Sequence, residues 1–135
     1  MRRRRNEGRV YVLAIFNTIT LKISAAYLGM VRGYTMRARV LDRKEAMVLE
    51  CAGRLTIRDR KSVERISNNI TRSGHSQVVI DLSKLDYIDS GGLGILLSLR
   101  DGAVDRGKRI AISGAADSVR EVLDIASFGT LFEIR

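Results

Sequence analysis

The chain has 135 residues, of which 45% are hydrophobic and 29% are charged. This composition excludes a wholly disordered chain, and the length suits one domain of about 100 to 150 residues rather than two separate cores. With no tryptophan, no proline and few aromatic residues, the core must be built from Leu, Ile, Val and Ala, which favours an α/β fold with helices packed on a sheet.

The formal net charge of +9 is concentrated near the amino terminus. Residues 1–35 contain seven Lys/Arg and one Glu, which gives +6, whereas residues 36–135 contain 17 Lys/Arg and 14 Asp/Glu, which gives +3. We therefore predict a basic, loosely ordered extension over 1–35 and one domain over 36–135. Because the elements of the domain begin only after Met36, we also expect that the extension lies upstream of a true start at Met36.

The extension has some features of a targeting segment. Its apolar run at 10–16 resembles the start of a secretory signal, but polar residues interrupt it from Asn17 onward. No run approaches the roughly 20 apolar residues of a membrane-spanning helix, so we expect no membrane span, and an amphipathic segment on a membrane or partner remains the alternative. The arginines at 2–5 and Arg9 have no interleaved aromatic residues, so we predict a solvated tail and no direct nucleic-acid binding.

Cys51 is the only cysteine, so no internal disulfide forms and no oxidising compartment is required. We expect a cytoplasmic protein in which Cys51, at the end of an apolar run, is a small buried side chain. One His and one Cys provide no ligand cluster, and both Gly-x-Gly-x-x-Gly and P-loop motifs are missing from the sequence. We therefore predict no metal and no cofactor.

From Met36 onward, β-like runs alternate with helical periodicity. Runs at 37–41 and 46–51, separated by a charged turn at 42–45, predict a β-hairpin. Apolar residues on one face of 58–73 predict an amphipathic helix. The elements predicted after it are a buried strand at 77–82, a helix over 93–104 that stops at Arg106-Gly107, a strand at 109–113, a helix over 119–126 and an edge strand at 131–134.

The strand at 77–82 leads through a short polar loop to a glycine-rich helix start, Asp89-Ser90-Gly91-Gly92-Leu93-Gly94. Ser90 falls where loop becomes helix, and its oxygen can accept a backbone N–H there, so the pattern predicts Ser90 as the N-cap. Each glycine costs about 1 kcal/mol relative to alanine in a helix interior, so packing or access must require the three glycines. Such small neighbours leave the Ser90 hydroxyl open.

This segment resembles STAS domains, a family named for sulfate transporters and anti-sigma-factor antagonists. Its motif Asp89-Ser90-Gly91-Gly92-Leu93-Gly94 matches the family pattern Asp-Ser-(Ser/Thr)-Gly-Leu-Gly, and the resemblance extends over residues 36–135. It is also carried by Gly53-Arg54-Leu55, Gly107-Lys108 and Val122-Leu123-Asp124. The resemblance implies a STAS-like mixed sheet of four or five strands with helices packed on it.

In bacterial antagonists of this family, the first serine of the motif is phosphorylated by the anti-sigma factor, a serine kinase that uses ATP. The resemblance therefore implies a protein without enzymatic activity that binds this kinase until Ser90 is phosphorylated, in a partner switch that regulates transcription. The residues to which it assigns partner binding are Asp89, Ser90, Gly91, Gly92, Leu93, Gly53 and Thr56. We expect a monomer or weak homodimer. The alternative is a non-switching STAS scaffold, or an accessory subunit of a signalling or transport complex.

Three positions depart from the family pattern. Gly91 replaces the usual Ser or Thr, which removes a hydroxyl and predicts a looser helix start. Thr56 stands where many relatives have Asp, so a carboxylate expected near the switch loop is missing. The sequence stops at Arg135, where relatives usually add a C-terminal helix, so we expect one face of the sheet or core to be less covered.

The segment 89–92 also resembles the nucleophile motif Gly-Asp-Ser-Gly-Gly-Pro of chymotrypsin-like proteases. However, Ile88 and Leu93 replace the flanking Gly and Pro, and the chain is too short for two barrels. His75, the only histidine, follows Ser73-Gly74 in what we predict to be a solvated turn. We therefore reject a serine hydrolase.

Overall fold

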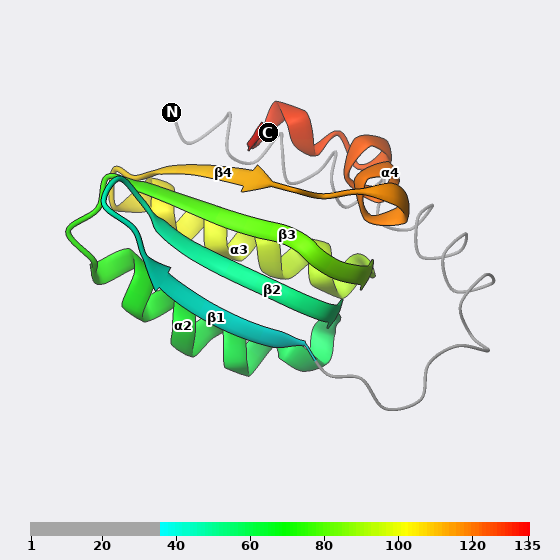
Figure 1. Ribbon diagram of the computed structural model, residues 1–135, viewed down its shortest axis with the longest axis horizontal. Helices are drawn as coiled ribbons and strands as arrows, with labels where there is room; N and C mark the ends of the chain where they lie inside the picture. Colours follow the sequence, from blue (N-terminus) through cyan, green and yellow to red (C-terminus); the bar gives the residue numbers. More distant parts are fainter. Residues whose placement is uncertain (1–35) are drawn as a thin grey trace.

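The computed structural model describes residues 36–135 (Figure 1), and the extension predicted over 1–35 lies outside the described residues. Its centre is a five-stranded sheet with the order β1-β2-β3-β4-β5. The strands are β1 (Arg37–Asp42), β2 (Met47–Leu55), β3 (Gln77–Ile88), β4 (Arg109–Ser113) and β5 (Glu133–Ile134). β1 and β2 form the predicted antiparallel hairpin, and all other neighbours are parallel. The predicted mixed sheet is therefore confirmed.

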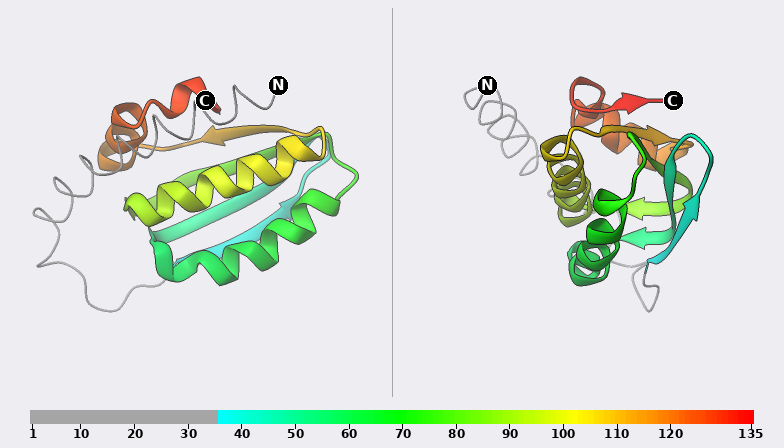
Figure 2. Two further views of the ribbon diagram at one scale, coloured as in Figure 1. Left: turned by 180° about the vertical axis from the view of Figure 1, so that it is seen from behind. Right: turned by 90° about the vertical axis from the view of Figure 1, so that its left-hand side faces the viewer.

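A helix lies in each connection between parallel strands: α2 (Arg60–Arg72), α3 (Ser90–Asp105) and α4 (Asp117–Ile125). Single 3₁₀ turns, η1 (Ile57–Asp59) and η2 (Phe128–Thr130), precede α2 and β5. Helices α2 and α3 lie side by side on one face of the sheet (Figure 2), and α4 lies beyond the carboxyl end of β4. No described helix crosses the opposite face of β1, β2 and β3 (Figure 1).

One apolar cluster joins the sheet to the helices. Ile80 and Leu82 of β3 have no exposed area and belong to the same cluster as Leu96 of α3 and Leu123 of α4. The cluster is almost entirely aliphatic, as the composition predicted. Its aromatic members, Phe128 and Phe132, stack with their ring centroids 5.4 Å apart.

The predicted order of elements is confirmed, but two strands are longer than predicted. β2 continues past Cys51 to Leu55, with register shifts on either side of Gly53, whose φ of 86° favours glycine. β3 continues to Ile88, so the predicted polar loop is in fact strand. The reason is burial, because Leu85 and Ile88 are only 6% and 2% exposed.

Cys51 is buried, as predicted, with 1% of its surface exposed. Burial is the main cause that raises the pKa of its thiol to about 12, and the nearby carboxylates of Asp81, Asp59 and Glu50 act in the same direction. The thiol is therefore protonated at neutral pH and is not a nucleophile.

His75 is not the solvated turn residue that the sequence predicted. Its side chain is only 21% exposed, and its Nε2 lies 2.9 Å from the carbonyl oxygen of Arg43 and 3.2 Å from the Asp42 carboxylate. These contacts hold the β1–β2 turn against the loop before β3. His75 precedes β3 whereas Ser90 follows it, and a strand of this length spans roughly 35–40 Å, so His75 cannot be a general base for Ser90.

Within residues 36–135, no helix is both long and apolar enough to cross a membrane. The same residues contain no cluster of three or more His, Cys, Asp or Glu side chains that could hold a metal ion.

Substitutions of one buried and one exposed residue of α4 test which side of this helix packs in the core. Leu123 has no exposed area, whereas Ile125 is 50% exposed. We expect Leu123→Ala to lower the free energy of unfolding by about 2–5 kcal/mol, because it removes buried contacts and leaves a cavity. Ile125→Ala, the matched control, should lower it by less than about 1 kcal/mol. Urea unfolding followed by circular dichroism measures both, and equal losses would contradict the proposed packing of α4.

Candidate functional site

The parallel pairing of β2 and β3 brings two distant segments together. The register ends with Leu55 opposite Ile88, so Thr56 and Asp89 leave the sheet at the same edge. The Asp89 N–H donates a hydrogen bond to the Leu55 carbonyl oxygen over 3.3 Å. Thr56 therefore lies beside the start of α3. The sequence predicts that both belong to one partner-binding site, which requires that they lie close together. Gly53 lies farther back in the sheet, opposite Leu85 of β3.

Asp89 caps α3, so the prediction of Ser90 as N-cap was wrong by one residue. Asp89 has an extended backbone, and its Oδ1 accepts a hydrogen bond of 2.8 Å from the Gly92 N–H. Its carbonyl oxygen accepts the first helical hydrogen bond, 2.9 Å from the Leu93 N–H. Ser90 is thus the first helical residue, partly exposed, and its hydroxyl has no hydrogen bond to any residue of the described part of the chain.

Two of the three glycines are required by close packing. A Cβ atom at Gly92 would lie 2.3 Å from the Leu55 carbonyl oxygen, and one at Gly91 would lie 2.6 Å from the Ile57 Cβ. The start of α3 therefore packs directly on the chain that leaves β2, and the expectation that Gly91 loosens it was wrong. Gly94 has no atom within 4 Å of the corresponding position, so packing does not explain it.

A buried carboxylate lies beside the site even though Thr56 replaces the family's Asp. The Thr56 N–H donates to Asp59 Oδ2 over 2.8 Å, and the Thr56 hydroxyl lies 3.3 Å from the same oxygen. Asp59 is only 7% exposed. Sequence reasoning missed this residue, although the Thr-x-x-Asp spacing is that of a capping box and indicated it.

Asp59 and Asp89 give the inner side of the site an acidic character. Burial is the main cause that raises the pKa of Asp89, and the charge of Asp59 adds to it. The hydrogen bonds from the Gly92 and Gly91 N–H groups act in the opposite direction and stabilise the carboxylate. Any negative group placed on Ser90 would therefore lie near two carboxylates and at a helix start.

The outer side of the site is apolar. Ile57 is 52% exposed and lies against Gly91. Sequence reasoning missed Ile57, because only the tertiary contact places it here. Of the residues assigned to partner binding, Gly92 and Leu93 are buried, with no exposed area at Leu93. They support the site from within the fold and are not available to a partner.

Arg54 follows Gly53 in β2 and lies near the end of the strand that leads to the site. It is only 8% exposed, and its guanidinium carbon lies 4.3 Å from the centre of the Tyr87 ring. This cation–π contact links the ends of β2 and β3 across the sheet, one residue before each strand ends. It therefore helps to hold Thr56 and Asp89 side by side.

Comparison with known proteins identifies similar sequences. The family model described as "Mlab, STAS domain" matches residues 38–133. A STAS-domain containing protein of Pseudomonas aeruginosa is 41% identical over 56 residues, which are 42% of this chain and 55% of that protein. The match thus spans about half the length of this curated relative.

Solved structures share the fold. An anti-sigma factor antagonist from Mycobacterium paratuberculosis has a TM-score of 0.66 and 17% identity, with 74% of this chain and 85% of that chain covered. The phosphorylated form of the Bacillus cell fate determinant SpoIIAA has a TM-score of 0.56 and 15% identity, with 75% and 91% covered. At these identities the similarity shows the fold alone.

The contacts at the glycines predict that replacement by alanine has opposite effects on stability at Gly92 and at Gly94. Gly92→Ala should lower the free energy of unfolding by about 1–3 kcal/mol, because the added methyl group collides with the Leu55 carbonyl. Gly94→Ala, the matched control, should raise it by about 0.5–1 kcal/mol, because alanine restricts the unfolded chain and meets no neighbour. Chemical denaturation measures both, and similar effects of the two substitutions would refute the close contact.

The raised pKa of Asp89 predicts a pH dependence of stability. The native state holds the Asp89 proton more tightly than the unfolded chain does, so this residue's contribution to stability falls as the pH rises from about 4 through the native pKa. Asp89→Asn keeps an oxygen for the Gly92 N–H but removes the charge. The free energy of unfolding of Asp89→Asn minus that of the wild-type protein should therefore increase as the pH rises over this range.

Urea unfolding at a series of pH values measures this difference. Asp89→Ala is the control, since it removes the cap and should cost about 1 kcal/mol. A difference between Asp89→Asn and the unmodified protein that does not change with pH would contradict the assignment.

Proposed function

Because the chain belongs to the family of STAS domains, we propose that it is an anti-sigma-factor antagonist controlled by phosphorylation of Ser90. In this proposal the unmodified protein binds an anti-sigma factor, a serine kinase that uses ATP, and thereby releases the sigma factor. The protein itself is not an enzyme. The observation that carries the proposal is that Ser90, at the first position of α3, is partly exposed and that no cap or neighbour in the described residues uses its hydroxyl.

The local electrostatics suit a modification that leaves the fold intact. A phosphate would add about −1.5 to −2 charges at Ser90. The start of α3 favours this negative charge, whereas the carboxylates of Asp89 and Asp59 oppose it. Since these effects act in opposite directions, the main change is in the surface that a partner meets. The phosphorylated form of SpoIIAA, which has the same fold, supports this premise.

The apolar side chain next to Ser90 explains how a phosphate would prevent binding. A partner that covers the exposed half of Ile57 also covers the neighbouring Gly91 and approaches Ser90. Burial of apolar area there favours the complex. A phosphate at the same place would have to lose its water, which costs far more than a single apolar contact contributes. Once Ser90 carries a phosphate, the stable complex with the partner is therefore lost.

The competing function is a non-switching STAS scaffold, or an accessory subunit of a signalling or transport complex. In that case the same surface binds a partner permanently, and modification of Ser90 plays no part. The two functions differ in one measurable property, which is the dependence of affinity on the group at position 90.

Phosphorylation can be tested with the purified full chain, its cognate anti-sigma kinase and ATP. We expect phosphate on Ser90, located by mass spectrometry, and no incorporation in Ser90→Ala. Ser90→Ala should keep the kinase bound, whereas Ser90→Asp should weaken the complex by at least about tenfold in titration calorimetry, because it places a charge in the interface.

Ser76→Asp is the matched control, since it adds the same charge at an exposed position beyond the opposite end of β3 and should leave the affinity unchanged. Equal affinities of Ser90→Ala and Ser90→Asp, or phosphate on another residue, would favour the scaffold.

A further inference from the structure

The positive charge of the described domain is carried by a single segment. Residues 57–72 contain five Lys/Arg and two Asp/Glu, which gives +3. Residues 36–56 and 73–135 together contain twelve of each, which gives zero. One of the two acids of the segment, Asp59, is buried. The surface of η1 and α2 is therefore strongly basic, and the remainder of the domain is balanced.

Four of these cations form what we call the basic ridge, which consists of Arg60, Lys61, Arg65 and Arg72 of α2. All four are exposed, and none forms an ion pair with another residue of the described part of the chain. Lys61 and Arg65 are about one helical turn apart, and Arg72 follows about two turns later, so these three share the outward face. Lys61 and Arg65 repel each other at this spacing, so this pair does not stabilise α2 itself.

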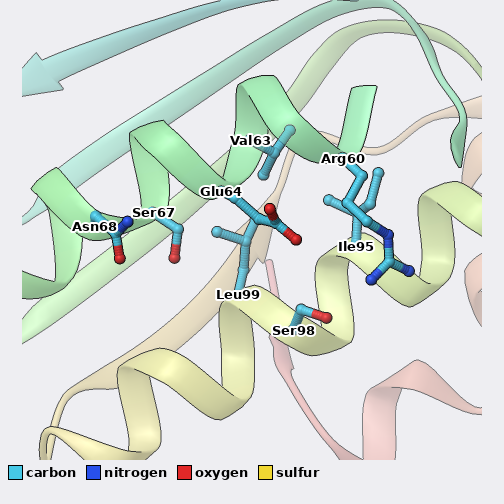
Figure 3. Close-up of a pocket in the computed structure, with 8 residues that line it drawn as sticks. All are labelled: Arg60, Val63, Glu64, Ser67, Asn68, Ile95, Ser98 and Leu99. Atoms are coloured by element: carbon cyan, nitrogen blue, oxygen red, sulfur yellow. The ribbon is translucent and has the colours of Figure 1, made fainter. Parts of the chain in front are cut away.

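A groove of about 320 Å³ lies between α2 and α3, and Arg60 of the ridge lines it (Figure 3). Its apolar lining residues, Val63, Ile95 and Leu99, are buried side chains of the two helices. Arg60 and Ser98 line it from opposite helices. The groove thus combines an apolar floor with polar sides, one of which belongs to the ridge.

The groove adjoins the Ser90 site. Ile95 follows Ser90 by five residues in α3, which corresponds to about 7.5 Å along the helix axis. Arg60 begins α2 immediately after η1, and η1 contacts the start of α3 through Ile57 and Gly91. The start of the ridge and the Arg60 end of the groove therefore lie near the start of α3, which carries Ser90.

We propose that the basic ridge and the groove together bind an acidic segment of the partner protein that also carries apolar side chains. The identity of this partner rests on the proposed function, and the charge of the segment follows from the ridge. Carboxylates of the segment pair with Lys61 and Arg65, and an apolar side chain lies on Leu99. Glu64 also lines the groove (Figure 3), so the acidic groups must lie over the ridge rather than in the groove itself.

A protein segment fits this surface better than other anions do. The α2 sequence has no aromatic residue on which bases could stack, which single-stranded nucleic acids require. The apolar face of α2 is packed in the core through Val63 and Ile70, so it cannot insert into a membrane. An acidic, partly apolar segment uses both the cations and the groove floor.

The same arrangement supplies a second cause of release on phosphorylation. Ser90 precedes the groove residue Ile95 by about 7.5 Å along the helix axis, and charges separated by about one Debye length, roughly 8–10 Å, are only partly screened. The added negative charge at Ser90 lowers the positive potential that attracts the acidic segment. Phosphorylation would therefore weaken the contact at the ridge as well as the contact at Ile57.

The probe for this surface is a fluorescein-labelled synthetic peptide that forms an amphipathic helix with Glu on one face and Leu on the other. A second peptide has Lys in place of every Glu. Fluorescence anisotropy with the full chain should show binding of the acidic peptide that weakens with salt, and little binding of the basic one. Lys61→Glu should reduce the affinity by about tenfold, whereas Lys44→Glu, an exposed lysine in the β1–β2 turn, should not.

Several results would overturn the proposal: no binding of the acidic peptide, equal binding of the basic peptide, or equal losses in Lys61→Glu and Lys44→Glu. Tighter binding of duplex DNA, or of phosphatidylglycerol vesicles, would assign the ridge to another class of partner. Methyl NMR of the complex should place the shifts at Ile95 and Leu99. This assay needs neither the kinase nor a phosphate. If the peptide binds but Ser90 is not phosphorylated, the proposed function is refuted and the proposal of an acidic-segment site is not.

Discussion

The contact between the start of α3 and the backbone that leaves β2 determines the geometry of the whole site. Gly92 and Gly91 allow α3 to begin against Leu55 and Ile57, at distances that exclude any side chain. Asp89 caps the helix from this position, so the next residue, Ser90, lies in its first turn, and no residue within 36–135 uses its hydroxyl. A larger residue at either glycine would move α3 away from β2, and the serine would lose its apolar neighbour.

This geometry also sets the balance of charge around Ser90. The helix start attracts an anion, while Asp59 and Asp89 repel one. Under the proposed function, this balance would let Ser90 carry a phosphate while the core stays folded. The core depends little on this balance of charge, because it is held mainly by apolar contacts that do not titrate.

Local patterns predicted the order of strands and helices because each element has its own periodicity. They did not predict where β3 ends, because Ser83, Lys84 and Asp86 resemble a loop until the parallel neighbour β2 is known. The choice between Asp89 and Ser90 as cap was also undetermined, since both residues cap well and only the backbone decides. Ile57 and Asp59 reach the site through the pairing of Leu55 with Ile88, which no local pattern contains.

The two ends of the sheet have different roles. At the amino end of β3, His75 and Lys108 hold loops together, since His75 contacts Arg43 and the Lys108 Nζ donates to the carbonyl oxygens of Ser73 and His75. At the carboxyl end of β3, Ser90 and Ile57 are at least partly exposed to solvent. The basic ridge begins at that same end, whereas the charges of residues 36–56 and 73–135 sum to zero. Lys61 and Arg65 have no ion-pair partner within residues 36–135, so the acidic segment proposed above would supply the opposite charges that the described fold does not provide.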